Sequence, residues 1–279
     1  SRHMSKKRLN SEEVRDHIVE WLGDYAQKAR AQGFVVGISG GVDSALTSTL
    51  CAMTGLRTIC VQMPIHQPKD QLARATEHIA QLSTRFPNVE ERYVELTQVF
   101  DSMVEANSEE RSEKFELALA NTRARLRMST LYLIAQANSC LVGGTGNKVE
   151  DFGVGFFTKY GDGGVDVSPI ADLMKTEVFQ LASLVSVPPS ILNAAPTDGL
   201  WEDDRGDEDQ LGASYPELEW AMHRAEKQMT TEGLEGREKE VMEIYLRLNR
   251  ANKHKMEPIP VCSIPQGWKS EISDRIDSL

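Results

Sequence analysis

Residues 34–44 read FVVGISGGVDS, an apolar run followed by a turn of glycines and small hydroxyl residues. The apolar part predicts a buried strand over 34–38, and the residues from Asp43 onward predict a helix. A strand, a glycine-rich loop and a helix in this order bring backbone N–H groups and the positive end of a helix toward an anion. The glycines also let the backbone approach phosphate oxygens closely. The stretch therefore predicts a phosphate-binding loop at the end of a strand.

The side chains of this loop support the same interpretation. Ser39, Asp43 and Ser44 provide two hydroxyls and one carboxylate. Hydroxyls donate to phosphate oxygens, and a carboxylate can hold Mg²⁺, which prefers oxygen ligands. No Gly-Lys-Ser/Thr follows, so the loop is not a Walker A motif. The alternative is an ordinary turn between a strand and a helix, in which Gly, Ser and Asp are common capping residues.

The bulk properties exclude several classes of protein. The chain has 279 residues, a formal net charge of −11 and four cysteines without a CxxC pair. The acidic charge argues against nucleic acid as a partner. The cysteine spacing argues against a zinc site or a disulfide framework. No apolar run is long enough for a membrane span, so we expect no membrane partner and a cytoplasmic location.

The order of predicted elements indicates the fold class. Apolar runs predict strands over 34–38, 57–63, 91–96 and 140–144, with helices between them, the longest over 112–138. Alternating strands and helices specify a parallel sheet with helices on both faces, so we expect a doubly wound α/β fold. Ligands of such folds bind beyond the carboxyl ends of the strands. The glycine-rich turns after the first and fourth predicted strands both fall there.

Three further clusters follow the fourth predicted strand. Residues 143–151 (GGTGNKVED) form a second glycine-rich turn, whose carboxylates could complete a Mg²⁺ site with Asp43. Residues 156–164 (FFTKYGDGG) present Asp162 within a tight turn. Lys175 falls near the start of a predicted helix, where a cation opposes the helix dipole unless an anion lies in front of it. The alternative for each cluster is a solvated surface segment.

The remaining segments predict loops and late helices. We expect a long loop over 146–170 and helices over 172–185, 214–229 and 236–252. Residues 196–212 are acidic, contain glycine and Trp201, and form a candidate mobile lid. The proline-containing tail predicts irregular structure. Residues 1–3 precede Met4 and are interpreted as an expression remnant.

These motifs together resemble a known family, the ammonia-using NAD synthetases, along nearly the whole chain. The resemblance rests on SGGVDS (39–44), GTGNK (144–148), GFFTKYGDGG (155–164), SPIADLMKTEV (168–178), PTDGLW (196–201) and DEDQLGASYPELE (207–219). The SGGxDS loop alone is shared across the ATP pyrophosphatase superfamily. The GFFTKYGDGG and DLMKTEV segments are more particular to NAD synthetases.

The resemblance implies a fold, a reaction and an assembly. The fold is a single domain over 1–279 with a doubly wound, mostly parallel five-stranded sheet similar to adenine nucleotide alpha hydrolases. The reaction is that of a ligase: deamido-NAD, ATP and ammonia give NAD, AMP and pyrophosphate through an adenylated nicotinate. A homodimer is implied as well. Free ammonia, or a separate glutaminase, is the expected nitrogen source, because no cysteine lies in a nucleophile-like context.

The resemblance also assigns roles to single residues. The ATP site is expected to include Gly37, Ser39, Gly40, Gly41, Asp43, Ser44, Thr145, Lys175 and Thr197. The deamido-NAD site is expected to include Asn121, Arg125, Lys159 and Asp162, and the catalytic residues are Asp162 and Lys175. The Mg²⁺ ligands are Asp43 and either Glu150 or Asp151, because this chain carries one residue more than the family pattern between GTGN and GFFTK. His254 matches a family position without an assigned role.

Two other functions stay open at this point. The chain could be another adenylating ATP pyrophosphatase, resembling GMP synthetase or a tRNA-modifying enzyme. The acidic charge and the lack of paired cysteines disfavour a tRNA enzyme. The chain could also be a non-catalytic protein that binds adenine nucleotides. Such a protein would not need Asp162 or Lys175.

Overall fold

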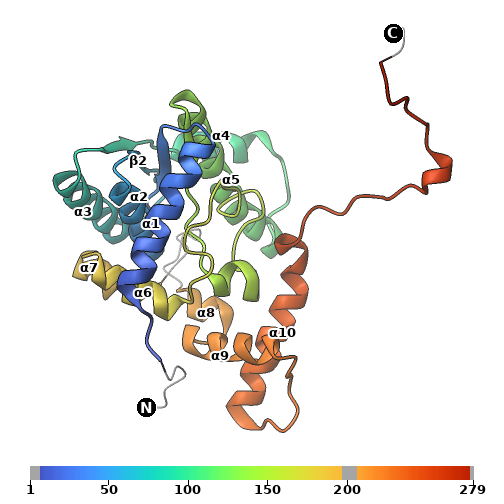
Figure 1. Cartoon of the computed structure of the whole chain (residues 1–279). Helices are drawn as coiled ribbons and strands as arrows, with labels where there is room; N and C mark the ends of the chain where they lie inside the picture. Colours follow the sequence, from blue (N-terminus) through green and yellow to red (C-terminus); the bar gives the residue numbers. More distant parts are fainter. Residues whose placement is uncertain (1–6, 197–205, 277–279) are drawn as a thin grey trace.

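The computed structural model describes residues 7–196 and 206–276 (Figure 1). Its strands are β1 (Gly33–Gly37), β2 (Arg57–Gln62), β3 (Val89–Tyr93) and β4 (Cys140–Val142). Its helices are α1 (Ser11–Lys28), α2 (Val42–Met53), α3 (Lys69–Arg85), α4 (Thr97–Ala106), α5 (Glu113–Ala137), α6 (Lys175–Leu184), α7 (Pro189–Leu192), α8 (Asp207–Leu211), α9 (Tyr215–Glu226) and α10 (Gly236–Met256). Two further short helices are η1 (Val149–Val154) and η2 (Gln266–Trp268).

The sheet confirms the predicted doubly wound α/β fold. Its strands pair in parallel in the order β3-β2-β1-β4. The chain therefore builds outward from β1 to β3 and then returns to the other side of β1. This reversal makes the boundary between β1 and β4 a topological switch point, where loops diverge and leave room for a ligand.

The prediction of a fifth strand was wrong. The described residues contain four strands in this sheet, and the chain beyond β4 makes only a single parallel bridge, between Gly143 and Val167. Gly144 N–H donates to the Val167 carbonyl at 2.7 Å, but the pairing does not extend into a ladder. Pro169, two residues after Val167, has no N–H to donate to a ladder, and proline is disfavoured within a central strand.

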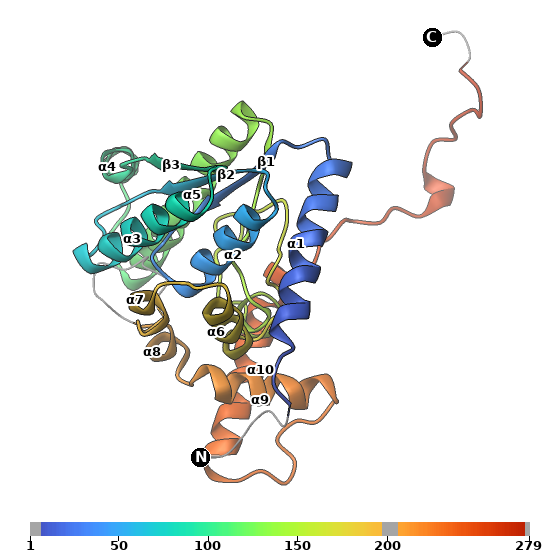
Figure 2. The ribbon, with the colours of Figure 1, turned by 60° about the vertical axis from the view of Figure 1, so that its left-hand side comes forward.

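The side chains of β1 alternate between the two faces of the sheet, and both faces are covered by helices. Phe34 and Val36 are buried against α1, α2, α3 and α6, whereas Val35 is buried against α4 and α5. Successive side chains of a strand point to opposite faces, so a continuous apolar run requires cover on both sides. Figure 2 shows α2, α3, α6 and α7 on the same side of the strands.

A third apolar cluster lies below the sheet and joins η1 to α9 and α10. Its buried members include Val149 and Val154 from η1, Leu218 from α9, and Met242 and Tyr245 from α10. The predicted loop over 146–170 thus contains a helix that the sequence pattern did not indicate. Burial against α9 and α10, which lie far along the chain, stabilises that helix more than local propensity does.

Several predicted boundaries shift by a few residues. The third strand is β3 (Val89–Tyr93) instead of 91–96, and the helix expected from 172 is α6, which begins at Lys175. The expected lid over 196–212 is described only in part. Residues 197–205 lie outside the described residues, and Asp207–Leu211 forms α8.

The segment after α10 leaves the body of the chain. Both views show it leading away from the helices (Figures 1 and 2). Its large apolar side chains are exposed, among them Val261, Trp268 and Ile272, which are 86%, 82% and 90% exposed. None of the helices within 7–196 and 206–276 is both long and apolar enough to cross a membrane.

Candidate functional site

The loop after β1 is closed by its own side chains. Ser39 N–H donates to Ser44 Oγ at 3.2 Å, the two serine hydroxyls lie 3.2 Å apart, and Gly41 N–H donates to Ser39 Oγ at 3.2 Å. Gly40 has φ +90°, and a Cβ there would lie 2.7 Å from the Gln71 carbonyl oxygen. A side chain at this position would therefore meet both an unfavourable backbone conformation and a backbone atom of α3.

Helix α2 begins directly at this loop. Its N-cap is Gly41, and no side chain caps it. The first N–H groups of an α-helix have no partner within the helix, and the helix dipole makes this end positive. The loop and the start of α2 together therefore form a surface of donors suited to an anion.

The loop after β4 needs partners from elsewhere in the chain. Lys148 N–H donates to the Leu173 carbonyl at 2.8 Å, and Asn147, which is buried, accepts the N–H of Glu150 at 3.1 Å. Gly146 is required here, because a Cβ would lie 2.2 Å from a carboxylate oxygen of Asp151. This loop leads into η1, which presents two successive carboxylates to the switch point.

The helix η1 is a π-helix, Val149–Val154. The wider π-helical turn accommodates one more residue than an α-helical turn, and such turns occur frequently at functional sites. It lies between Asn147 and Gly155, where the sequence predicts one residue more than the family pattern. Gly155 ends the turn with φ +67°. The π-helix thereby brings Glu150 to Lys175 and Asp43.

Lys175 lies at the centre of a buried charge cluster. Its side chain is 4% exposed, and its Nζ lies 2.5 Å from Asp43 Oδ2 and 3.9 Å from Glu150 Oε1. Burial lowers the pKa of Lys175, but the carboxylates of Asp43, Glu150 and Asp207 outweigh burial and raise it above its ordinary value. Lys175 therefore stays charged, and Asp43 is the anion in front of it that its place at the start of α6 requires.

The carboxylates of this cluster differ in their partners. Asp43 Oδ1 is buried and has no hydrogen-bond partner within the described residues. Burial, followed by the charge of Asp43, raises the pKa of Glu150 well above its ordinary value. Burial, followed by the charge of Asp162, raises the pKa of Asp151 to about 7. Glu150 thus belongs to the Lys175 cluster, whereas the charge with the largest effect on Asp151 is that of Asp162.

Tyr215 and Asp207 complete this cluster, and both were missed by sequence reasoning. Tyr215 Oη lies 2.7 Å from Glu150 Oε1 and 2.9 Å from Asp207 Oδ2. Lys175 Nζ lies 5.0 Å from the centroid of the Tyr215 ring, in a cation–π contact. The only sequence signal was the DEDQLGASYPELE segment, which contains both residues but does not place them beside η1.

Helix α5 holds the glycine-rich turn that carries Asp162. Asn121 Oδ1 accepts from the Thr158 hydroxyl at 2.6 Å, and Arg125 Nε donates to the Lys159 carbonyl at 3.1 Å. Asp162 Oδ1 accepts from Thr158 N–H at 2.7 Å. The turn is held from the other side by Lys255, which donates to two carbonyls of the 155–157 segment at 2.6 Å. His254, next to it, is exposed.

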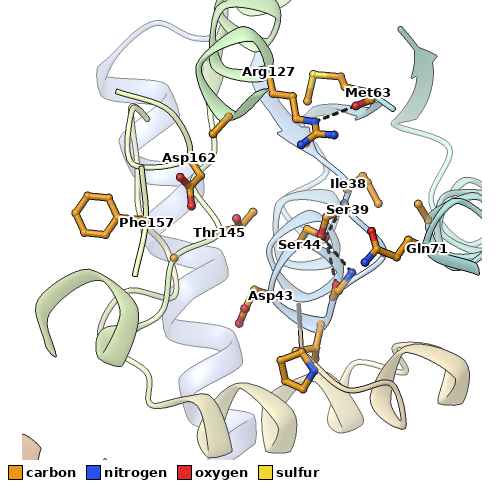
Figure 3. Close-up of a pocket in the computed structure, with 18 of the residues that line it drawn as sticks. Ile38, Ser39, Asp43, Ser44, Met63, Gln71, Arg127, Thr145, Phe157 and Asp162 are labelled. Carbon is orange, nitrogen blue, oxygen red and sulfur yellow. Dashed lines mark hydrogen bonds between the residues drawn. The ribbon is translucent and has the colours of Figure 1, made fainter. Parts of the chain in front are cut away.

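These loops enclose one cavity of about 220 Å³ at the switch point (Figure 3). Ser39, Ser44 and Asp43 lie on one side of it, and Thr145, Phe157 and Asp162 face them. The predicted site residues that line it are Gly37, Ser39, Gly40, Gly41, Asp43, Ser44, Thr145, Glu150, Asp151, Asp162 and Lys175. Asn121, Arg125, Lys159 and His254 do not line it, and Thr197 lies outside the described residues.

Other lining residues were not found by sequence reasoning. Arg127 reaches the cavity from α5, where its Nε donates to the Met63 carbonyl at 2.9 Å and its guanidinium donates to Gln67 Oε1 at 2.8 Å. Gln71 and Arg74 line it from α3. No motif marks these residues. Helix α5 carries three arginines at alternate positions, and only the tertiary structure decides which one faces the cavity.

Comparison with known proteins assigns the family. The family model for NAD synthase matches residues 14–259. An NH(3)-dependent NAD(+) synthetase of Mesoplasma florum is 41% identical over 212 residues, which cover 76% of this chain and 84% of that protein. One of Carboxydothermus hydrogenoformans is 36% identical over 251 residues, which cover 89% of this chain and 96% of that protein.

The solved structures agree. The structure of NMN synthetase from Francisella tularensis superposes with a TM-score of 0.78 at 29% sequence identity, covering 92% of this chain and 99% of that chain. The sequence motifs, the fold and the cavity at the switch point all accord with these matches. The chain belongs to the NAD synthase family.

Proposed function

We propose that this protein is an ammonia-dependent NAD synthetase, a ligase that converts deamido-NAD, ATP and ammonia to NAD, AMP and pyrophosphate. The observation that carries the proposal is the cavity at the switch point. Donors of the 39–44 loop lie beside Asp43 on one side of it, Asp162 faces them, and Lys175 also lines it, in a chain whose relatives bear this name. A carboxylate is a poor electrophile, and adenylation gives it a good leaving group. Ammonia can then displace AMP.

In this proposal the donor surface at the start of α2 binds the outer phosphates of ATP. The backbone N–H groups and the hydroxyls of Ser39 and Ser44 accommodate the pyrophosphate as it leaves. Lys175 provides a buried positive charge toward the same phosphates, since its side chain is 4% exposed and faces the cavity. Thr145 and Gly37 contribute further contacts to ATP, and Thr197 is assigned to the same role.

The residues present fit Mg²⁺. Asp43 Oδ1 is a buried carboxylate oxygen without a hydrogen-bond partner among the described residues, and Glu150 lies in the same cluster. No three His, Cys, Asp or Glu side chains within residues 7–196 and 206–276 form a metal cage. Mg²⁺ is usually held by one or two carboxylates together with substrate phosphates, which suits this pair. The bound ion would neutralise phosphate charge. Asp151 is the alternative second ligand.

Asp162 is proposed as the proton acceptor for ammonium. Ammonium must lose a proton before it can attack, and a carboxylate shielded from water can accept it. Asp162 lines the cavity, and the Thr158 N–H holds one of its oxygens at 2.7 Å. Asn121, Arg125 and Lys159 belong to the proposed deamido-NAD side. They connect α5 to the Asp162 turn and do not line the cavity of a single chain.

We also propose that the protein is a homodimer located in the cytoplasm. The tail after α10 exposes Val261, Trp268 and Ile272 almost fully, and its hydrogen bonds within the described residues stay inside the tail. Exposed apolar side chains of this size favour burial against another chain, and most oligomers of soluble proteins consist of identical chains. A monomeric mass in light scattering at micromolar concentration would refute the dimer.

The reaction is tested directly. Purified protein is incubated with deamido-NAD, ATP, Mg²⁺ and ammonium, and the nucleotides are separated by chromatography. The proposal predicts NAD, AMP and pyrophosphate in equal amounts. ADP as the product, or intact ATP without NAD, would overturn it. A reaction with glutamine in place of ammonium serves as the control for the nitrogen source.

A second candidate substrate is the deamidated mononucleotide. The observation that favours it is the likeness to the NMN synthetase of Francisella tularensis, at a TM-score of 0.78 and 29% identity. The adenylation and amidation chemistry at the nicotinate carboxylate would be the same. Parallel assays with nicotinate mononucleotide and deamido-NAD decide between them, because the preferred substrate has the higher kcat/KM.

A further inference from the structure

The hydroxyl of Tyr215 joins two buried carboxyl groups from separate parts of the chain. Its Oη lies 2.7 Å from Glu150 Oε1 on η1 and 2.9 Å from Asp207 Oδ2 on α8, while Tyr215 itself begins α9. Tyr215 and Asp207 are 3% and 4% exposed. Water therefore cannot readily replace either contact, and a buried hydrogen-bonding group that loses its partner is costly.

Glu150 has few other contacts to fix its carboxylate. Within the described part of the chain, the Tyr215 hydroxyl is its hydrogen-bond donor, and Lys175 Nζ lies 3.9 Å away. Both contacts fall on Oε1. Oε2 is left without a described partner, and Glu150 lines the cavity. The hydroxyl thus holds one oxygen of the carboxylate and leaves the other available to a ligand in the cavity.

Tyr215 also touches the cation of the cluster. Lys175 Nζ lies over its ring, 5.0 Å from the centroid, and the same Nζ lies 2.5 Å from Asp43 Oδ2. The ring and the hydroxyl therefore contact Lys175 and Glu150 at the same time. Partners that orient a metal-binding carboxylate typically contribute 10–100-fold to metal affinity.

We propose that Tyr215, oriented by Asp207, is a positioning residue that fixes the Glu150 carboxylate for a divalent cation bound with ATP. The inference rests on the proposed function, because Glu150 is a cation ligand only within it. Tyr215 acts through Glu150 and touches no substrate in this account. Asp207 Oδ2 lies 2.9 Å from the same Oη, so the single proton of the hydroxyl is shared between Glu150 and Asp207.

The test compares Tyr215→Phe with Tyr245→Phe. Tyr245 is a matched control because it is 4% exposed, belongs to the same apolar cluster, and makes no side-chain hydrogen bond with a described residue. Mn²⁺ affinity is measured by electron paramagnetic resonance with a non-hydrolysable ATP analogue present. Tyr215→Phe is expected to weaken Mn²⁺ binding roughly 10–100-fold, and Tyr245→Phe less than about twofold. The melting temperatures of both variants show whether packing was damaged.

Equal Mn²⁺ affinities in the two variants would overturn the proposal. A positioning role also predicts that excess Mg²⁺ restores turnover of Tyr215→Phe, which a misfolded site would not show. Asp207→Asn keeps an amide that can accept from or donate to the hydroxyl, and it is expected to bind Mn²⁺ more tightly than Asp207→Ala; the reverse order would contradict the bridge. If the wild-type protein makes NAD and the Tyr215→Phe variant binds Mn²⁺ normally, the positioning role is refuted and the proposed function stands. Wild-type protein that makes no NAD refutes the proposed function.

Discussion

The two loops that flank the switch point reach their conformations by different routes. The loop after β1 is closed by Ser39, Gly41 and Ser44, all within a few residues of one another. The loop after β4 takes its contacts from Leu173, far along the chain, and its helix η1 packs on α9 and α10. The first loop is therefore specified mainly by local sequence, and the second mainly by tertiary packing.

This difference explains why one side of the cavity provides backbone donors and the other side provides charged side chains. The locally closed loop presents its backbone donors mainly through its own contacts, with α3 close against Gly40. The η1 side instead carries side chains whose positions depend on Lys175, Tyr215 and Asp207. Substitutions in the first loop should therefore weaken phosphate binding. Substitutions on the η1 side should also disturb the packing of α8, α9 and α10 against the site.

The largest expected effect belongs to Asp43→Asn. Loss of this carboxylate removes a proposed cation ligand and the closest partner of Lys175, so turnover should fall roughly 1000-fold. Glu150 and Asp207 still surround Lys175, so the melting temperature should change little. Steady-state assays and thermal unfolding check both, with the exposed Asp16→Asn as control. If the Asp43→Asn variant turned over at the wild-type rate, Asp43 would not be a residue of the active site.

Asp162→Asn should have the next largest effect. Asparagine keeps the shape and an oxygen that can accept from Thr158 N–H, but it cannot take a proton from ammonium. Turnover should fall roughly 100-fold while ATP affinity stays near the wild-type value. ATP titration by calorimetry beside the kinetic assay separates these effects. If ATP binding collapses as well, the carboxylate holds the turn instead of accepting a proton.

Gly40→Ala tests the locally closed loop, and Gly55→Ala at the other end of α2 is its control. Both glycines have positive φ, +90° and +78°, but a Cβ at Gly40 meets the Gln71 carbonyl oxygen whereas one at Gly55 meets open space. Positive φ alone costs on the order of 1–3 kcal/mol. Gly40→Ala should lose more stability than Gly55→Ala and should also weaken ATP binding, as thermal unfolding and calorimetry would reveal. Equal losses would mean that α3 does not constrain the loop.

The smallest expected effect concerns His78, a buried residue of α3 that contacts Ser48 of α2. Burial, followed by the charge of Arg85, lowers the pKa of His78 to about 4, and Ser48 Oγ lies 2.8 Å from its Nε2. The unfolded chain binds a proton below its ordinary pKa of about 6.5, whereas the folded chain does not until about pH 4. Stability contributed by neutral His78 is therefore complete above pH 6.5 and is lost as the pH falls toward 4.

His78→Gln removes this titration and keeps a side chain that can bond to Ser48. Melting temperatures measured from pH 7.5 to pH 4 should fall less steeply for the variant than for the wild type. Parallel curves would show that His78 does not titrate differently in the folded and unfolded chains.

Much of the fold followed from the sequence. The periodicity of residues 34–62 predicted β1, α2 and β2 closely, because a fully buried strand and a buried helix leave strong apolar patterns. The fifth strand was wrong, and η1 was missed, because a short helix in a glycine-containing segment has no strong period. Its position depends on burial against α9 and α10.

The candidate site divides in the same way. The sequence by itself determined the donor loop at 39–44, because glycine, serine and aspartate act there within one turn of chain. Only the tertiary structure decided that Glu150 lies with Lys175 and that Tyr215 bridges Glu150 to Asp207. The physical reason is distance along the chain: contacts between η1, α6, α8 and α9 come from packing in three dimensions, which no local pattern encodes.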